Sequence, residues 1–471
     1  MGALNLDKFS GLTCDSRHVK PGMIFAALPG TYSDGRDFIP KAIENGAGAI
    51  LSLPGLPALS VPSIEDENPR LAYARLAARF HPGQPKTLIA MTGTNGKSST
   101  VEFLRQIWDF AGYPAACFGT LGVRSAKGNS PLSHTTPDAV DLHRALARLK
   151  EEGVTHVAME ASSHGLDQYR LDSVKISAAG FSNLTQDHFD YHRNIHEYFA
   201  AKARLFTELT PSKADVVINV DDVYGQEIAD LCKARGQSVL TIGWQGKDIS
   251  IKAIKARPAS QSVRLDVLGH KLEFELPLVG AFQVFNVVCA LGLALVTGVR
   301  REKAIAALSS LKGVAGRMEQ AGHSHKGAPI FIDFAHTEDG LEKVLTSLRP
   351  HTEGELVIVF GCGGDRDPDK RAKMGAVAAR LADQVIVTDD NPRSEDPPLI
   401  RRAIMRGCPK ARNIGGRAKA IAAAIDILGE KDCLVIAGKG HETGQIIAGV
   451  TYPFSDSEEV QKYLKEQGHD G

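Results

Sequence analysis

The last third of the chain alternates short apolar runs with stretches that carry apolar residues at helical spacing. The apolar runs lie at 330–332, 356–360, 385–387 and 434–437. Helical stretches separate them, for example at 371–382 and 418–428. Apolar strands that alternate with helices are typical of parallel sheets covered on both faces. The pattern therefore predicts a doubly wound α/β domain over residues 316–471.

The middle of the chain starts with an apolar run at 88–91, which predicts a buried strand. A turn bounded by Gly93 and Gly96 follows, and residues 101–108 again show apolar positions at helical spacing. Further strands are predicted at 154–159 and 272–276, and further helices at 197–206 and 284–296. These elements predict a central α/β domain with a mostly parallel sheet over residues 85–315.

The beginning of the chain predicts a smaller α/β domain over residues 1–84. Apolar runs at 22–28 and 47–52 indicate strands, and helices are expected from residue 38 and at 71–80. Pro82, Gly83 and Pro85 then mark a linker. The whole chain is thus predicted to be an α/β protein of three domains, which suits 471 residues at roughly 100–200 residues per domain.

Composition narrows the class of protein. Lysine plus arginine and aspartate plus glutamate number 55 each, so no global charge favours nucleic acid or a membrane surface. The seven cysteines show no C-x-x-C pair, which indicates reduced thiols rather than disulfides or a zinc site. No apolar run approaches the roughly 20 residues of a membrane span. We expect a monomer in the cytoplasm that binds neither nucleic acid nor membrane.

The turn at 93–96 predicts a phosphate-binding loop. Glycines let the backbone aim N–H groups at an anion, and the helix that follows adds the positive end of its dipole. Lys97 can reach the outer phosphates of ATP, and the Ser98 hydroxyl can bind Mg²⁺. The general motif would place a glycine where Met91 stands. An ordinary strand-to-helix turn is the alternative.

Other polar clusters also follow predicted strands. Glu160 ends the strand at 154–159 and can hold Mg²⁺ or cap a helix. The segment 183–192 is rich in metal-binding side chains, including Asp187 and His188, without the spacing of a zinc motif. In the last domain, polar clusters follow all the apolar runs. Ligands bind at the carboxyl ends of strands in open α/β sheets, so these clusters predict a binding surface.

These motifs, taken together and in order, resemble the Mur ligase family over nearly the whole chain. The resemblance rests on short segments that include Asp15-Ser16-Arg17, 93–99, Thr135-Thr136-Pro137, 160–170, Gly316-Arg317-Met318-Glu319, 333–336, Asp390-Asn391-Pro392-Arg393 and 438–442. It implies an N-terminal domain for a uridine nucleotide, a central ATPase domain and a C-terminal Rossmann-like domain for an incoming amino acid. It also implies that ATP activates a carboxylate, which an amine then attacks. The form of residues 390–393 is similar to that of the diaminopimelate-adding branch.

The resemblance also implies roles for individual residues. The ATP site would comprise Gly93, Thr94, Asn95, Gly96, Lys97, Ser98, Ser99, Asn286, Arg317 and Asp333. The UDP-N-acetylmuramoyl dipeptide would contact Ser16, Thr135, Thr136, Ser162, Gln168 and Arg170. Meso-diaminopimelate would contact Arg366, Asp390, Asn391, Pro392, Arg393, Gly438 and Glu442.

Catalysis and metal binding are implied at a smaller set. Lys97, His188 and Lys202 would be catalytic. Ser98 and Glu160 would hold one Mg²⁺, and His188 with a carbamylated Lys202 would serve a second. Carbamylation turns a cationic lysine into a carboxylate-like anion, which is the charge that a metal neighbour needs.

The sequence departs from the family pattern at several positions. Thr31-Tyr32 stand where His-Gln is common, His134 stands where Asn is common, and Phe334 replaces a common Tyr. These departures bear on the uridine and muramoyl contacts, not on the reaction class. Three alternatives stay open for the function: a lysine-adding ligase of the same family, a folylpolyglutamate synthetase, or a P-loop nucleotide switch that does not ligate. A folylpolyglutamate synthetase would account neither for the N-terminal domain nor for residues 390–393. A GTPase would need an N-K-x-D motif, which the sequence lacks.

Overall fold

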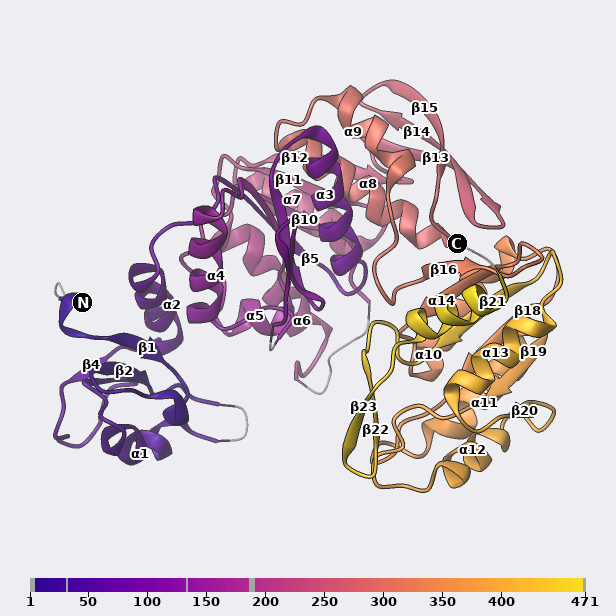
Figure 1. Ribbon diagram of the computed structural model, residues 1–471. Coiled ribbons are helices and arrows are strands. Elements are labelled where there is room, and N and C mark those ends of the chain that lie inside the picture. Colours follow the sequence, from indigo (N-terminus) through magenta and orange to yellow (C-terminus); the bar gives the residue numbers. More distant parts are fainter. Residues whose placement is uncertain (1–4, 31–32, 133, 186–190, 469–471) are drawn as a thin grey trace. The chain divides into compact units, whose positions relative to one another are not determined.

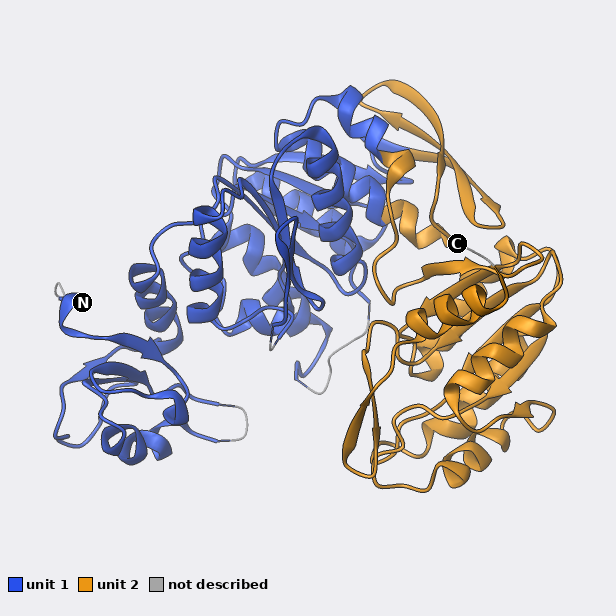
Figure 2. Cartoon of the chain, in the orientation of Figure 1, with its two compact units in different colours: residues 1–250, 286–307 blue, residues 251–285, 308–471 orange. Residues whose placement is uncertain are grey.

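The computed structural model describes residues 5–30, 33–132, 134–185 and 191–468, which divide into two compact units (Figures 1 and 2). Unit 1 comprises residues 1–250 and 286–307, and unit 2 comprises residues 251–285 and 308–471. The helix α8 (Ala281–Val296) begins in unit 2 and ends in unit 1. The α/β class predicted from the sequence is confirmed in both units.

Unit 1 begins with a small parallel sheet of strand order β1-β2-β3-β4. The strands are β1 (Gly11–Thr13), β2 (Met23–Ala26), β3 (Ala49–Ser52) and β4 (Ser63–Glu65). The helices α1 (Ile39–Glu44) and α2 (Pro69–Phe80) accompany it. Asn68 caps α2, because its side chain accepts a hydrogen bond from the backbone N–H of Leu71, and Pro69 occupies the first turn. The predicted strands and helices of this part are confirmed.

Within unit 1 the larger sheet has the strand order β12-β11-β10-β5-β9-β6-β7-β8, and β13, whose residues from 251 on belong to unit 2, pairs with β12. Its strands are β5 (Thr87–Thr92), β6 (Ala115–Gly119), β7 (Gly122–Ser125), β8 (Gly128–Ser130), β9 (His156–Glu160), β10 (Ala178–Phe181), β11 (Asp215–Asn219), β12 (Ser238–Gly243) and β13 (Ile249–Arg257). The pairings from β12 to β6 are parallel, and β7 and β8 continue the sheet antiparallel. β5 therefore lies inside the sheet, between β10 and β9.

Helices cover this sheet and bury its apolar residues. They are α3 (Lys97–Ala111), α4 (Ala139–Glu151), α5 (Ser163–Asp167), α6 (Ile195–Arg204), α7 (Val223–Ala234) and α9 (Arg301–Ala307). Leu88 and Val157 from the strands pack in one core with Leu146 of α4. Trp108 of α3 is fully buried, and its indole N–H donates to Oγ1 of Thr297 at 3.1 Å. The core thus fixes α3 directly after β5.

Unit 2 contains a sheet of order β16-β17-β21-β18-β19-β20. Its strands are β16 (Glu319–His323), β17 (Pro329–Asp333), β18 (Leu356–Phe360), β19 (Gln384–Val387), β20 (Arg412–Asn413) and β21 (Cys433–Ala437). Only the β16–β17 pairing among these described strands is antiparallel. The hairpins β14 (Ser260–Val267) with β15 (His270–Leu276), and β22 (Gly444–Ile447) with β23 (Val450–Pro453), complete the unit.

Separate cores lie on the two faces of this sheet. The helices of unit 2 are α10 (Glu338–Leu348), α11 (Lys370–Leu381), α12 (Pro397–Met405), α13 (Arg417–Ile427) and α14 (Asp456–Glu466). Leu341, Met374 and Ile404 from α10, α11 and α12 share one core, whereas Ile421 and Val460 from α13 and α14 share the other. The prediction of a doubly wound sheet is confirmed.

Short helical turns connect the main elements. The 3₁₀ turns are η1 (Leu6–Lys8), η2 (Ser16–His18), η3 (Gly35–Phe38), η5 (Leu308–Ser310) and η6 (Arg349–His351), and η4 (Leu205–Leu209) is a π-helical turn. Within the described ranges, no helix is long and apolar enough to cross a membrane.

A buried ion pair joins α13 to α14 in unit 2. The guanidinium of Arg417 donates to both carboxylate oxygens of Asp456, at 2.6 and 2.7 Å, and both side chains are fully buried. Replacing Asp456 with alanine would leave the buried guanidinium without its carboxylate partner. We predict that Asp456→Ala lowers the free energy of unfolding by about 3–5 kcal/mol.

The matched control removes an exposed pair of the same unit, between Arg380 and Glu342, whose side chains are 56% and 48% exposed. Glu342→Ala should cost less than about 1 kcal/mol. Urea unfolding followed by circular dichroism measures both variants. If Asp456→Ala and Glu342→Ala unfold at the same urea concentration, the buried pair contributes no more stability than the exposed pair.

Candidate functional site

The phosphate loop follows β5 and turns on two glycines. Gly93 has φ +146° and Gly96 has φ +86°, and α3 begins directly afterwards. A Cβ atom at Gly93 would lie 2.0 Å from Oγ of Ser182, and one at Gly96 would lie 2.2 Å from Oδ1 of Asn286. A larger residue at either turn would adopt a strained backbone and would force the neighbouring side chain to shift. Asn286, predicted from the resemblance, does lie against the loop.

The segment after β10 ties down this loop. The N–H of Thr94 donates to the carbonyl of Asn183 at 2.8 Å, and the N–H of Asn95 donates to Oδ1 of Asn183 at 3.1 Å. The Ser182 hydroxyl donates to the carbonyl of Asn95 at 2.6 Å. The loop is thus braced before α3, whose first N–H groups have no partner within the helix and point toward any bound anion.

The two predicted catalytic lysines meet at one carbonyl of the loop. Nζ of Lys97 donates to the carbonyl oxygens of Gly93 and Thr94, at 2.9 and 2.8 Å. Nζ of Lys202, on α6, donates to the same Gly93 oxygen at 2.8 Å and lies 4.2 Å from the ring centre of Tyr198. Lys202 is only 1% exposed. The resemblance alone could not have shown this convergence.

Glu160 ends β9, the strand beside β5, and its partner in register is Met91. The side chain is buried, and Oε1 accepts a hydrogen bond from the N–H of Thr120 at 2.9 Å. The described residues contain no group of three or more His, Cys, Asp or Glu side chains that could hold a metal ion. Mg²⁺ commonly takes one or two carboxylates, with waters and substrate phosphates as its other ligands. A single buried carboxylate at this strand end fits that need. Asp187 and His188 lie outside the described residues.

Most residues predicted for the uridine substrate form one hydrogen-bonded group in unit 1. The Thr136 hydroxyl donates to the carbonyl of Glu160 and lies 3.0 Å from Oγ of Ser162, which caps α5. Arg170 donates to the carbonyl of Thr136 and to Oε1 of Gln168, both at 2.7 Å.

The other two members of the predicted uridine set make separate contacts. Thr135 contacts the hydroxyl of Thr120 at 3.2 Å. Ser16 lies in η2, where its carbonyl accepts a hydrogen bond from the Asn45 side chain.

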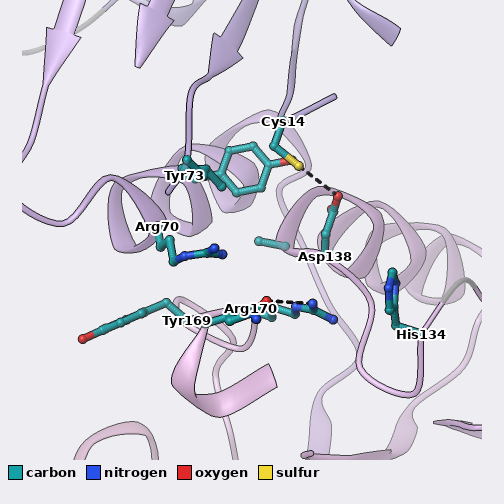
Figure 3. A pocket seen from close by; sticks show the side chains of 10 residues that line it. Cys14, Arg70, Tyr73, His134, Asp138, Tyr169 and Arg170 are labelled. Atoms are coloured by element: carbon teal, nitrogen blue, oxygen red, sulfur yellow. Dashed lines mark hydrogen bonds between the residues drawn. The ribbon is translucent and has the colours of Figure 1, made fainter. Parts of the chain in front are cut away.

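A pocket of about 270 Å³ adjoins this group in unit 1 (Figure 3). Its lining includes the predicted Gln168 and Arg170, and His134, the departure from the family pattern. The remaining lining residues are Cys14, Leu28, Arg70, Tyr73, Asp138, Ala139 and Tyr169. Sequence reasoning did not single these residues out. Some adjoin the quoted motifs, but only the fold brings Arg70 and Tyr73 of α2 to the same pocket.

The charges in this pocket are mixed. Arg70 and Arg170 supply guanidinium groups, and Asp138 supplies a carboxylate. Burial, together with the charge of Asp138, raises the pKa of the Cys14 thiol to about 11. The thiol therefore stays protonated at neutral pH and donates to Asp138 at 3.8 Å. The two guanidinium groups can pair with an anionic group of a ligand, and the Asp138 carboxylate can accept a hydrogen bond from it.

The predicted nucleotide residues of unit 2 lie together, Arg317 just before β16 and Asp333 at the end of β17. Asp333 is buried and accepts hydrogen bonds from the N–H groups of Met318 and Ala335, both at 2.8 Å. Burial raises the pKa of this carboxyl group. The Arg317 guanidinium lies 4.8 Å from the ring centre of Phe334. Phe334, which stands where tyrosine is common in the family, therefore still packs its ring against Arg317.

The loops after β19 and β21 meet, as predicted for the amino-acid site. Nδ2 of Asn391 donates to Oε2 of Glu442 at 2.9 Å. A Cβ atom at Gly438 would lie 2.6 Å from Oδ2 of Asp390, so only glycine allows this approach. Arg366, on the loop after β18, is exposed. Lys439 stands between the predicted residues and was not singled out from the sequence.

Arg393 is held in the left-handed region, with φ +52°. Its N–H donates to the carbonyl of Ile446 at 3.0 Å, and its carbonyl accepts from the N–H of Ala448 at 2.7 Å. Its guanidinium donates to the carbonyl of Gly364 at 2.7 Å. The hairpin strand β22 thus fixes this arginine beside Pro392, a connection that sequence reasoning did not predict.

Comparison with known proteins identifies the family. The profile of the Mur ligase family catalytic domain matches residues 8–81, that of the Mur ligase middle domain matches 91–294, and that of the Mur ligase glutamate ligase domain matches 316–440. A protein of Caulobacter vibrioides named UDP-N-acetylmuramoyl-L-alanyl-D-glutamate–2,6-diaminopimelate ligase is 50% identical, over 97% of this chain and 95% of the relative. The chain belongs to the Mur ligase family. It is therefore a ligase, as predicted, rather than a nucleotide switch.

Other relatives of this Mur ligase agree. A protein of the same name from Chelativorans sp. is 48% identical over 97% of this chain and 95% of its own length. A solved structure with that name is 34% identical and superposes with a TM-score of 0.76, over 98% of this chain and 96% of the other. The predicted family and fold class are confirmed.

The phosphate loop offers a test of its packing. Gly96 and Gly112 flank α3 in similar left-handed conformations, φ +86° and +92°, but a Cβ atom at Gly112 would meet nothing within 4 Å. Gly112→Ala should therefore cost only the left-handed strain, about 1–2 kcal/mol. We predict that Gly96→Ala lowers the free energy of unfolding by more than Gly112→Ala does, because the new methyl group overlaps the side chain of Asn286.

Urea unfolding followed by tryptophan fluorescence measures both variants, since Trp108 and Trp244 lie in unit 1. In the double variant Gly96→Ala/Asn286→Ala the overlap is removed, and the extra cost should disappear. If the two single glycine variants unfold at the same urea concentration, the overlap does not constrain the loop.

Proposed function

We propose that this Mur ligase joins meso-2,6-diaminopimelate to UDP-N-acetylmuramoyl-L-alanyl-D-glutamate, with ATP as the energy source, in peptidoglycan precursor synthesis. The observation that carries the proposal is 50% identity over 97% of the chain to a relative of that name. The domains proposed for the three substrates are 1–84 for the uridine nucleotide, 85–315 for ATP and 316–471 for the amino acid.

The proposed reaction has two steps. The D-glutamyl carboxylate attacks the γ-phosphorus of ATP, so that an acyl phosphate forms and ADP leaves. The neutral amine of diaminopimelate then attacks the acyl carbon. A C–N bond forms, the C–O bond to phosphate breaks, and the amine loses a proton. The product is an amide, and inorganic phosphate is released.

The residues of the phosphate loop suit the first step. Two anions approach each other, so cations and N–H donors must offset their repulsion. Gly93 and Gly96 allow the turn, and Lys97 begins α3 with its ammonium at the carbonyl of Gly93. The N-terminus of α3 would face the phosphates, and Lys97 would contact the transferring group. Bound Mg²⁺ would supply further positive charge, held by Ser98 and Glu160 at one site and by His188 with carbamylated Lys202 at a second.

The pocket of unit 1 supports the assignment of the uridine substrate. That substrate carries a diphosphate and carboxylates, and the pocket presents Arg70 as well as the predicted Arg170. Guanidinium groups are suited to both kinds of anion. UDP-activated sugars and ATP are cytoplasmic metabolites, so we propose that the ligase acts in the cytoplasm, as a monomer that binds neither nucleic acid nor membrane.

Arg393 supports diaminopimelate over lysine. Diaminopimelate carries one more carboxylate than lysine, and a rigidly placed guanidinium can bind that carboxylate with two hydrogen bonds. The backbone of Arg393 is fixed by β22, and Gly364 orients its side chain. A lysine substrate would leave the arginine unpaired and would repel it. The lysine-adding ligase stays as the alternative.

The first test uses the native protein. ADP formation is measured with the UDP-dipeptide and with either meso-diaminopimelate or L-lysine. We expect rapid ADP formation only with the UDP-dipeptide and diaminopimelate together. Equal use of lysine would overturn the proposed substrate, and ADP formation that needs neither co-substrate would overturn the ligase reaction.

The selecting role of Arg393 is tested by substitution. Losing a charged hydrogen bond of roughly 1.5–3 kcal/mol should lower kcat/KM for diaminopimelate by about 10- to 150-fold in Arg393→Ala, and the preference over lysine should fall accordingly. The control Arg380→Ala removes an exposed guanidinium of the same unit and should change neither. If Arg393→Ala keeps the native preference, another residue selects the amino acid.

The carbamate on Lys202 is tested by labelling. A lysine amine reacts with CO₂ only when neutral, and burial favours the neutral form. The carbamate retains an N–H that can still donate to Gly93. We predict a carbamate carbon signal after incubation with ¹³C-bicarbonate, lost in Lys202→Gln and kept in Lys97→Gln, which alters the other lysine at Gly93. A signal that persists in Lys202→Gln would place the adduct elsewhere.

A further inference from the structure

A buried lysine lies beneath the proposed diaminopimelate site. The side chain of Lys439 is fully buried, and its ammonium donates to Oδ1 of Asn391 at 3.1 Å and to Oε2 of Glu442 at 3.0 Å. A buried cation is costly unless it is paired and hydrogen-bonded. These two acceptors come from different loops, one after β19 and one after β21. Lys439 therefore joins the two loops at one point.

The side chain of Asn391 is also used within the protein. Its Oδ1 accepts from Lys439 and from the N–H of Ile446 at 3.0 Å, and its Nδ2 donates to Oε2 of Glu442 at 2.9 Å. An amide oxygen has two acceptor positions, and both are occupied here. Only one N–H of the amide is left over. Asn391 thus bridges Lys439, β22 and Glu442, and its oxygen cannot bind a substrate as well.

Glu442 is oriented by these contacts. Both Lys439 and Asn391 donate to the same oxygen, Oε2, while within the described residues Oε1 accepts no hydrogen bond. The side chain remains 36% exposed. One oxygen is therefore anchored inward, and the other is free to accept from a cation that enters the site.

We propose that Lys439 is a positioning residue for the amino-acid substrate. Through Oε2 of Glu442, and through Asn391, it aims Oε1 of Glu442 at the non-reacting ammonium of diaminopimelate. Asn391 acts in the same way, as a positioning residue rather than as a direct ligand through its oxygen. This inference rests on the proposed function, because it names the partner of that substrate's second amine.

Removing the ammonium should release Glu442 without removing it. We expect Lys439→Met, which keeps a long unbranched side chain, to raise KM for diaminopimelate about 10-fold or more. KM for ATP and for the UDP-dipeptide should stay within about twofold. The matched control is Lys431→Met, because Lys431 pairs with Glu353 on the surface of the same unit and is 68% exposed. The control should change none of the three KM values.

A double-mutant cycle separates positioning from a general structural role. Glu442→Gln and the double variant Lys439→Met/Glu442→Gln are compared with each single change. If Lys439 acts through Glu442, the double variant should show nearly the KM for diaminopimelate of Glu442→Gln alone. The proposal would be overturned if the fold-change in KM for diaminopimelate in the double variant equals the product of the two single fold-changes. It would also be overturned if Lys439→Met raises all three KM values equally.

A second variant keeps the test decisive if Lys439→Met does not fold. Asn391→Ala breaks the same bridge and leaves both charges, so it should raise KM for diaminopimelate selectively and should also be non-additive with Glu442→Gln. An unchanged KM for diaminopimelate in Asn391→Ala would show that the hydrogen bonds of Asn391 do not position Glu442.

The turnover of the native protein is measured before these variants. If the native protein uses another amino acid, the proposed function fails. The double-mutant cycle is then run with that amino acid, so that the role of Lys439 is decided by itself.

Discussion

The carbonyl oxygen of Gly93 is the point on which the proposed chemistry of unit 1 depends. It accepts hydrogen bonds from Lys97, at the start of α3, and from the buried Lys202 on α6. Because Gly93 has no side chain, the loop can approach Ser182, whose hydroxyl donates to the carbonyl of Asn95 in the same loop. The turn, the helix N-terminus and both lysines are thus held around one backbone oxygen. A phosphate site of this kind needs little rearrangement to bind an anion.

A similar constraint governs unit 2, but there buried cations rather than glycines organise the loops. Arg417 pairs with Asp456 and lies 3.8 Å from Oδ2 of Asp390, while Lys439 pairs with Glu442. Each carboxylate proposed to meet the amino acid therefore has a buried cation next to it. Since charge can be buried only when it is paired, these contacts give the loops after β19 and β21 one arrangement. The substrate then meets groups that are already oriented.

The elements that the sequence predicted are those whose patterns are local. The apolar runs at 356–360 and 434–437 became β18 and β21, and the glycine turn at 93–96 leads into α3. The family resemblance also named residues that prove to be neighbours, such as Thr136, Ser162 and Arg170. The antiparallel strands β7 and β8 and the hairpin of β22 and β23 were not predicted. Each of these strands has only three or four residues, too few for a clear pattern, and pairing with neighbours decides their conformation.

By itself, the sequence determined the α/β class and the glycine turn before α3, and it predicted a binding surface at the strand ends, because hydrophobic periodicity and glycine turns act over a few residues. Only the tertiary structure decided which side chains share a hydrogen bond. Lys439 and Asn391 are 48 positions apart, and Lys202 and Gly93 are 109 apart. Arg70 of α2 reaches the pocket of Arg170 in the same way. Such contacts depend on how separate helices and strands pack, and no pattern along the chain records that packing.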